Sequence, residues 1–478
     1  MKATRTVLIP RTKDSNLGEQ TTLQSFMSPA PEAELPLVNG SCASTKCYLP
    51  PPEDGYLLLQ EFLHDFNSRI PLFAPQSLQT LFRDCYSGAN EGVPLAWVIV
   101  YATMAITHRL RAMSLFATPI DTPQGMWYLE MCLTRLPELL MGPPSLKLVQ
   151  ASLCLCFLLQ TSNHRQRAEL FASTALHMAQ SLGYNELPSI PLVDTVLVRE
   201  QGYVFWVAFF LDVNMSLGHQ QPSSQRLADI ATPLPSQDMV DWWDVENNTV
   251  KTCEWNLNIF SLHGSLAMIE AEASEKLFSV EARKRSPLDS PCVYKDILSK
   301  LERWREGNML AKLNAEEVFK AMYRSDIVHC VMLEGAYFRT RYQLHATKAL
   351  VGFRVRLDAF TPEALQAVID QKIEPCYEDA KRFLSLAMLL PQGNLSTTWA
   401  CFQAIVAAFC SIVSAQAIGN AGTIKHKSED LQLSHEVLVA LNFATEGQIE
   451  PAHEAVINLC RKLYTQMTVG WKQSIKRR

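Results

Sequence analysis

The sequence predicts an all-α fold, in which one large multi-helix domain of packed helical hairpins surrounds a buried central helix. Beyond about Pro52, apolar residues recur at spacings of three and four, which is the period of an amphipathic helix. Sustained alternation of apolar and polar residues, the pattern expected of strands, is absent. From Tyr203 to Leu211 no residue is charged, and a stretch that is apolar on all sides cannot face water.

The composition sets the broad class of the protein. Of the 478 residues, 48% are hydrophobic and 19% are charged, which suits a globular protein with a large core. The formal net charge is −5, whereas a domain that mainly grips phosphates would be basic, so most of the chain is not expected to bind nucleic acid. No apolar run reaches the roughly 18 residues of a membrane span, and residues 402–419 are interpreted as a buried helix.

The thirteen cysteines are scattered along the chain, and most of them lie in apolar runs. Free thiols are distributed in this way when they serve as small core residues. Because no secretory signal is recognised at the start of the sequence, a reducing compartment is expected.

Three regions are predicted along the chain. Residues 1–52 hold seven prolines and few large apolar residues, which indicates a disordered arm, and this arm begins with basic residues. Residues 53–282 are predicted to form the main helical domain, and residues 283–478 a C-terminal helical half packed on the same domain. Helices are expected, in order, over residues 55–86 with a break near Ile70-Pro71, 93–117, 124–140, 145–160, 164–183, 195–217, 254–282, 290–306, 312–345, 361–390, 396–418, 430–445 and 451–473. Residues 283–291 and 420–430 are polar and are predicted to be surface loops.

Two glycines are expected to close helices. Seven apolar residues between Ala168 and Leu182 recur at helical spacing and form one stripe, and Gly183 follows where a left-handed helix terminus favours a residue without a side chain. The apolar central helix similarly ends near Gly218.

A single carboxylate, Asp212, interrupts the apolar central helix. It is bordered by Leu211 and Val213, and a charge in such surroundings is costly unless it is paired. We interpret Asp212 as a structural residue that makes an ion pair or a helix-cap contact, and a ligand anchor is the alternative. A catalytic role is not expected, because no histidine, lysine or second acid stands at helical spacing from it.

Sequence patterns of catalytic and metal sites are missing. No glycine-rich phosphate loop, HExxH zinc pair or nucleophile elbow occurs, so neither an enzyme nor a bound cofactor is expected. His435-Glu436 and His453-Glu454 lack a second histidine at helical spacing and are interpreted as ordinary surface residues. Cys154 and Cys156 would point to different sides of a helix and do not form a zinc site.

Three blocks in a fixed order resemble the regulatory middle region of fungal binuclear-zinc-cluster transcription factors. They are FNSRIPLFAPQSLQTLF at residues 66–82, ALHMAQSLGY at residues 175–184, and the central helix with the segment that follows it. We call the matching positions the signature residues, and they are Pro71, Phe73, Gly183, Arg199, Phe205, Trp206, Asp212, Gly218 and Pro222. The resemblance covers roughly residues 55–240 and implies that residues 53–282 are the fungal regulatory domain.

The sequence also departs from the family pattern. An arginine that the family has after the aspartate is Val213 here, and the family's Gly-Arg-Pro turn contains His219. The family binds two zinc ions through six closely spaced cysteines, whereas only Cys42 and Cys47 precede the helical region. The resemblance therefore implies no zinc in this chain, and it leaves open a lost DNA-binding module or an incomplete gene model.

The resemblance implies a nuclear transcription regulator, pathway-specific for metabolic or secondary-metabolite genes, rather than an enzyme. The alternative is a DNA-free co-regulator or ligand-sensing interaction module that pairs with a full-length relative. The implied partners are DNA, reached through the missing module or through a partner, and other transcription regulators. A small-molecule effector and a homo- or heterodimer are left open, and no membrane partner is expected.

Overall fold

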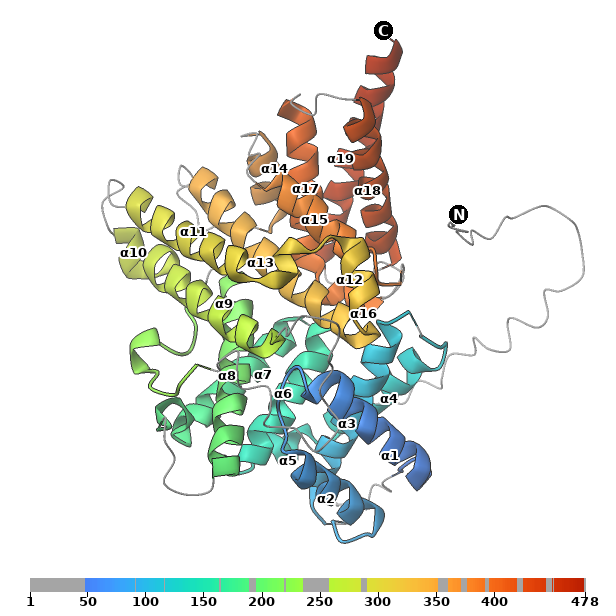
Figure 1. Cartoon of the computed structure of the whole chain (residues 1–478), viewed down its shortest axis with the longest axis vertical. Coiled ribbons are helices and arrows are strands. Elements are labelled where there is room, and N and C mark those ends of the chain that lie inside the picture. The colour runs from blue at the N-terminus through green and yellow to red at the C-terminus, as the bar shows by residue number, and fades with distance from the viewer. Residues whose placement is uncertain are drawn as a thin grey trace, which may run out of the picture. The chain divides into compact units, whose positions relative to one another are not determined.

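The computed structural model describes residues 48–90, 92–115, 117–162, 165–188, 195–218, 221–234, 258–284, 290–350, 360–370, 376–391, 395–418, 424–443, 449 and 451–476. Residues 49–478 form one compact unit. Every regular element in these described ranges is a helix, so the predicted all-α class is confirmed (Figure 1). Within the same ranges, none of the helices combines the length and the apolar character that crossing a membrane requires. The predicted arm lies outside the described residues as far as residue 47.

The first half of the unit leads to the central helix α8. Its elements are α1 (Pro52–Glu61), the π-helical turn η1 (Phe62–Asn67), α2 (Pro75–Tyr86), α3 (Pro94–Ala112), α4 (Asp121–Leu133), α5 (Leu136–Leu140), α6 (Leu146–Gln160), α7 (Arg165–Ser181), η2 (Tyr184–Glu186) and α8 (Thr195–Gly218). The break expected near Ile70-Pro71 lies between η1 and α2. Pro75 and Pro94 each begin a helix, a position where a proline sacrifices no hydrogen bond.

The second half continues from the segment after α8. Its elements are η3 (Leu227–Asp229), α9 (Ile259–Ala273), the π-helical turn η5 (Ser274–Phe278), α10 (Val280–Lys284), α11 (Ser290–Gly307), η6 (Met309–Lys312), α12 (Ala315–Ala321), α13 (Arg324–Leu350), α14 (Pro362–Asp370), α15 (Tyr377–Ala387), α16 (Leu395–Ala400), α17 (Phe402–Ile418), α18 (Ile424–Phe443) and α19 (Pro451–Lys476). Helix α17 is buried along the part of its length whose side chains are described, as predicted for residues 402–419.

Helix α8 is the buried central element that the sequence predicts. Every side chain from Tyr203 to Val213 is buried, and the helix packs against α6, α7, α9 and α13. Because neighbours cover all of its sides, the helix shows no polar stripe in this stretch. The position of α8 therefore sets the positions of the residues on α6, α7, α9 and α13 that pack against it.

Helix α13 connects the two halves of the unit. On the N-terminal side of the chain it packs against η1, α3, α8 and α9. On the C-terminal side it packs against α14, α15 and α17. Figure 1 shows α13 between the helices drawn in blue to green and those drawn in orange to red. A long helix in contact with both groups makes their cores continuous.

Local predictions for Gly183 and the cysteines are confirmed. Helix α7 ends at Ser181, and Gly183 has a φ of 76°, the left-handed conformation that a glycine adopts without strain. The ten cysteines of the described part are free, and all but Cys292 are buried.

Two element predictions are wrong. Residues 312–345 do not form one helix, because the chain is extended at Met322 between α12 and α13. Residues 424–430 are not a loop but the first turns of α18, and Asp430 is fully buried there. Four further predicted helices are divided into shorter elements, namely 124–140, 254–282, 361–390 and 396–418.

Candidate functional site

Asp212 is a buried hydrogen-bond acceptor rather than half of an ion pair. Its Oδ1 accepts from Ser173 Oγ at 2.8 Å and from Ser224 Oγ at 3.0 Å. Its Oδ2 accepts from Ser223 Oγ at 2.8 Å and from the Ser224 backbone N–H at 2.9 Å. Within the described residues no cation pairs with this fully buried carboxylate, so four donors compensate the charge. The carboxylate thereby ties α7 and α8 to the chain that follows α8.

We call residues 221–234 the return segment, because they lead the chain back along α7 and α8. Trp206 donates its Nε1–H to Pro233 O at 2.7 Å. Asn185, in the turn after Gly183, donates its side-chain N–H to Asp229 O at 3.0 Å, and its carbonyl oxygen accepts from the Thr232 backbone N–H at 3.0 Å. Trp206 of the third block and Asn185, which directly follows the second block, therefore act together with Asp212 to hold this segment.

The first block forms a second buried turn beside α8. The Asn67 carboxamide oxygen accepts the backbone N–H groups of Leu72 and Phe73, each at 3.0 Å. Glu200 of α8 accepts from the Ala74 backbone N–H at 2.8 Å and from Gln150 Nε2 at 2.9 Å. Pro71 and Phe73 are buried in this turn. Helix α8 thus receives the first block near its start and the return segment near its end.

The other signature residues have different surroundings. Arg199 is half-buried in the first turns of α8, and Pro222 is exposed in the return segment. Gly218 is the last residue of α8, and a Cβ there would lie 2.9 Å from Gln403 Oε1, so a larger residue would require the end of that side chain to shift. Val213 is buried, and His219 lies outside the described residues.

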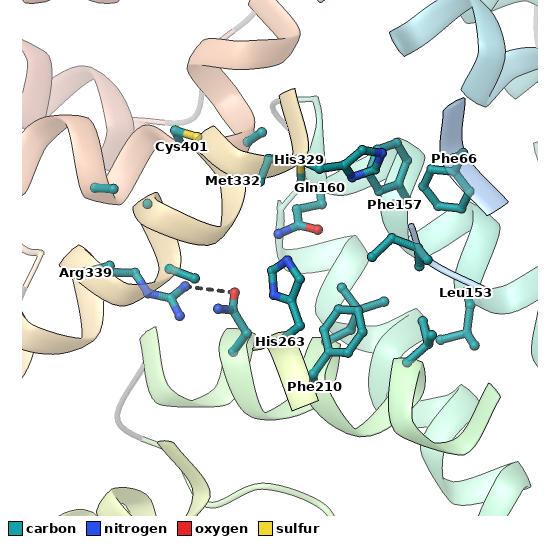
Figure 2. Close-up of a pocket in the computed structure, with 18 of the residues that line it drawn as sticks. Phe66, Leu153, Phe157, Gln160, Phe210, His263, His329, Met332, Arg339 and Cys401 are labelled. Carbon is teal, nitrogen blue, oxygen red and sulfur yellow. Dashed lines mark hydrogen bonds between the residues drawn. The ribbon is translucent and has the colours of Figure 1, made fainter. Parts of the chain in front are cut away.

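A cavity lies against α8 where the two halves of the unit meet. We call it the central cavity, and its wall includes residues of η1, α6, α8, α9, α13, α16 and α17. Its volume is about 60 Å³, whereas one water molecule needs roughly 10–15 Å³. The aromatic rings in the wall are Phe66, Phe157 and Phe210, and the polar side chains are Gln160, Asn214, His263, His329, Arg339 and Gln403. Figure 2 shows Arg339 at one side, Phe66 and Leu153 at the other, and His263 between them.

The charged groups at the central cavity balance each other. Arg339 is buried and donates from Nη1 to Asn214 Oδ1 at 3.0 Å, while its Nη2 lies 3.6 Å from Glu270 Oε1. Burial lowers the pKa of Arg339 and raises the pKa of Glu270, and each group opposes the shift in the other. Glu270 also accepts from Thr340 Oγ1 at 2.5 Å. Among the described residues, the Nε and Nη2 atoms of Arg339 have no hydrogen-bond partner.

The histidines of the central cavity are neutral near pH 7. Burial, with a further contribution from His329, lowers the pKa of His263 from 6.5 to about 3. Burial also lowers the pKa of His329, whose Nε2 lies 2.8 Å from Asp65 O. The His263 ring stacks on Phe210 with centroids 4.9 Å apart.

Acid is expected to destabilise the protein through His263. The unfolded chain binds a proton near pH 6.5 and the folded chain only near pH 3, so the stabilisation present above pH 6.5 is lost as the pH falls through this window. The loss from this side chain is about 2 kcal/mol by pH 5, at about 1.4 kcal/mol per pH unit. Urea unfolding at pH 7 and pH 5 measures it, and His263→Phe should remove this part of the pH dependence. His435→Phe, which replaces an exposed histidine, is the control and should keep the pH dependence of the wild type. If His263→Phe also kept it, the pH dependence could not be assigned to His263.

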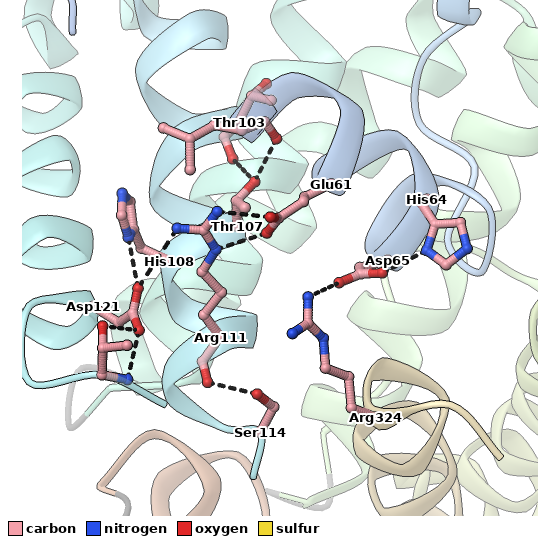
Figure 3. A network of polar contacts seen from close by, with 12 residues as sticks. Glu61, His64, Asp65, Thr103, Thr107, His108, Arg111, Ser114, Asp121 and Arg324 are labelled. Carbon is pink, nitrogen blue, oxygen red and sulfur yellow. Dashed lines mark hydrogen bonds and ion pairs between the residues drawn. The ribbon is translucent and has the colours of Figure 1, made fainter. Parts of the chain in front are cut away.

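A second polar cluster lies around η1, α3 and α4 (Figure 3). Glu61 makes a two-bond ion pair with Arg111 at 2.6 and 2.7 Å, and His108 Nδ1 lies 3.0 Å from Asp121 Oδ1. Asp121 also accepts from the Thr118 hydroxyl and backbone N–H at 2.6 and 2.8 Å. Since these groups satisfy one another, the cluster fastens the end of α1 and the start of α4 to α3 rather than presenting a reactive group.

The structure also locates the motif fragments considered in the sequence. His453 is half-buried and its ring lies 4.9 Å from that of Phe402, so the interpretation of it as an ordinary surface residue is wrong, whereas His435 is exposed. Cys42 and Cys47 lie outside the described residues. In the part of the chain that is described, no group of three or more His, Cys, Asp or Glu side chains is placed to hold a metal ion.

Sequence reasoning did not find the residues that complete these sites. Ser173, Ser223 and Asn185 are common polar residues, and their roles follow only from the packing of α7 against α8. His263 and Arg339 are 76 positions apart in the sequence and carry no motif. An isolated histidine within the apolar run of α9 was the one available signal.

Comparison with known proteins gives a family match and several similar proteins. A protein family described as "Fungal specific transcription factor domain" matches residues 59–306 of this chain. ABC-transporter-regulating transcription factors of Aspergillus oryzae and Aspergillus fumigatus are each 25% identical over 426 residues, which is 86% of this chain and 46% of each relative. The fusaridione A cluster transcription factor of Fusarium heterosporum is 26% identical over 261 residues, or 54% of this chain and 48% of that protein. The chain thus spans about half the length of the curated relatives it matches.

Proposed function

Because the chain belongs to the family of the fungal-specific transcription factor domain, we propose that it is a nuclear transcription regulator whose helical unit is the regulatory part. The observation that carries this proposal is the family match over residues 59–306, which contains α8 and all nine signature residues. Phe73 lies in the turn of the first block, and Trp206 and Asp212 hold the return segment on α8, so these features shared with the family support a fold rather than a reaction site.

We propose a pathway-specific role. Two of the similar proteins are named for regulating ABC transporters and a third for the fusaridione A cluster. A limited set of transport or secondary-metabolite genes is therefore the proposed target. We further propose that DNA is contacted through a zinc-cluster module, in the same protein or in a dimer partner, and that the helical unit acts on other regulators. The net charge of −5 supports this division of labour.

A ligand-sensing role is the second candidate, and the central cavity favours it. The cavity lies between helices of the first half and α13 and α17, so a bound molecule would contact both groups. A ligand that binds one arrangement of these helices better than another shifts the population between them.

The proposed function is tested by tethering. The full 478-residue chain is fused to an unrelated DNA-binding domain, and transcription of a reporter with the matching operator is measured in a fungal host. A change in reporter transcription that requires the operator is expected, together with nuclear fluorescence of a tagged chain. The DNA-binding domain alone and a reporter without the operator are the controls. A cytoplasmic tagged chain that leaves the reporter unchanged would refute the proposal.

A second arm addresses the target genes. Deletion of the gene should change the transcripts of a small, functionally related set of transport or biosynthetic genes, and reintroduction of the chain should reverse the change. A diffuse change across unrelated genes would contradict a pathway-specific role without affecting the tethering result.

A further inference from the structure

The central cavity contains a half-buried imidazole, that of His263, which has no hydrogen-bond partner among the described residues. His263 is crowded by neighbouring atoms, yet part of its surface remains free because it faces the cavity. Figure 2 shows its ring projecting between Phe210 and Gln160. A neutral imidazole has one N–H donor and one acceptor nitrogen, and buried polar groups are normally satisfied by protein, water or ligand. We therefore expect the imidazole to form a hydrogen bond with a molecule inside the cavity.

The rest of the wall defines the shape of that partner. Phe66, Phe157 and Phe210 provide aromatic faces, and Leu153 adds to the apolar side. The cavity volume corresponds to about four to six water molecules, which is the size of a small aromatic molecule. An apolar body that covers these faces would gain roughly 25 cal/mol for each Å² removed from water.

The charges of the wall exclude an ion of either sign. Arg339 is the cation, and Glu270, 3.6 Å away, compensates it behind the wall. His263 and His329 are neutral, so a bound carboxylate or ammonium would leave an uncompensated charge in a buried site. The donors at the wall include the His263 N–H and the amide of Asn214, whose Oδ1 is occupied by Arg339. They also include Nε and Nη2 of Arg339, which have no hydrogen-bond partner among the described residues and lie on the side of the cavity opposite Phe66.

We propose that the central cavity binds an uncharged, mainly apolar small molecule whose carbonyl oxygen accepts a hydrogen bond from His263. The apolar body lies against the aromatic side, and the carbonyl points toward His263 and Asn214. The ligand touches α6, α8 and α9 on one side and α13 and α17 on the other. Its role as an effector rests on the function proposed above, whereas its binding chemistry does not.

The binding is tested with three probes of similar size that differ in polarity. Acetophenone is neutral with a carbonyl, ethylbenzene lacks the carbonyl, and benzoate is charged. Each is titrated into the purified 478-residue chain near pH 7.5 and followed by saturation-transfer NMR. Acetophenone is expected to bind saturably and about fivefold more tightly than ethylbenzene, the effect of one net hydrogen bond. Benzoate is expected to bind at least about tenfold more weakly than acetophenone because of its desolvation.

Two variants locate the site. His263→Phe keeps the ring that stacks on Phe210 but removes the donor, so acetophenone should fall to the affinity of ethylbenzene while ethylbenzene is unchanged. Ala336→Leu adds volume to the wall on α13 and should block both probes. His435→Phe, on the exposed side of α18, is the matched control and should bind like the wild type.

Several results would overturn the proposal. The first is that acetophenone shows no saturable binding, which means that the cavity holds water only. The second is that benzoate binds more tightly than acetophenone. The third is that His263→Phe leaves the affinity for acetophenone unchanged. The probe series on the wild-type chain decides the ligand class even if a variant fails to fold. Since these measurements use no transcription readout, failure here leaves the tethering result intact, and failure of tethering leaves the binding result intact.

Discussion

An Asp212→Ala chain is expected to lose about 3–5 kcal/mol of unfolding free energy, one of the two largest effects expected of a single substitution. The carboxylate is fully buried and accepts four hydrogen bonds from Ser173, Ser223 and Ser224. Hydrogen bonds to a charged group contribute about 1.5–3 kcal/mol each, and their donors would be left without an acceptor. Urea unfolding measures the loss, and limited proteolysis should show earlier cleavage within the return segment.

Two comparison variants separate the loss of the hydrogen bonds to Asp212 from the effect of removing any one negative charge. Asp212→Asn keeps one acceptor oxygen and should lie between the wild type and Asp212→Ala. Asp296→Ala removes an exposed carboxylate whose partner is Lys300, and it should leave the unfolding free energy close to that of the wild type. If Asp212→Ala remained within about 1 kcal/mol of the wild type, the anchoring role would be wrong.

The second large effect is expected at the buried pair of Arg339 and Glu270. Arg339→Met should cost about 3–5 kcal/mol, because it leaves Glu270 buried without its cation. The double variant Arg339→Met/Glu270→Gln should recover a large part of this loss, since no unpaired charge remains. Unfolding free energies of the two single variants and the double variant give the coupling between the residues.

This pair also predicts a pH dependence with a defined sign. Burial already raises the pKa of Glu270 above its ordinary value of 4.5, and removing Arg339 raises it further. An acid with a raised folded pKa stabilises the fold at low pH and loses that contribution as the pH rises. Arg339→Met should therefore be more destabilised, relative to the wild type, at pH 8 than at pH 5.

Arg305→Met is the matched control for the arginine substitution. Its partner Glu334 also lies 3.9 Å from Arg382, so a second cation remains beside the carboxylate. The control should cost less than Arg339→Met. Equal costs and an additive double variant would show that Arg339 and Glu270 do not act as a pair.

The sequence predicts best where a local pattern decides the structure. The uncharged run from Tyr203 to Leu211 requires burial whatever its neighbours are, and α8 is buried there. Gly183 likewise follows from a local rule, because a left-handed helix end favours glycine.

Predictions fail where distant contacts decide. Residues 424–430 carry four charged side chains among seven, a composition that indicates a solvated loop. In the structure the carboxylate of Asp430 is buried, because Tyr377 donates to it at 2.8 Å and Lys381 lies 3.8 Å away. Both partners come from α15, so a polar segment becomes helical through contacts about fifty residues away in the sequence.

The central cavity could not be predicted for a related reason. Its polar wall combines Asn214, His263 and Arg339 from three separate helices. None of them has a spacing that indicates a site, and the match to a family identifies the fold in which they meet. The direction of the His263 pKa shift depends on burial, which the sequence around it does not reveal.

The burial of the cysteines makes the chain selective toward thiol reagents. Burial raises the pKa of Cys376 to about 12 and also raises the pKa of Cys132, Cys154 and Cys330, so little reactive thiolate forms near neutral pH. Cys292, near the start of α11, is the one exposed cysteine in the described ranges. With Cys42, Cys47 and Cys253, the three cysteines outside the described ranges, replaced by serine, a maleimide dye would therefore mark α11, and its fluorescence would report how that helix moves when the neighbouring core is perturbed.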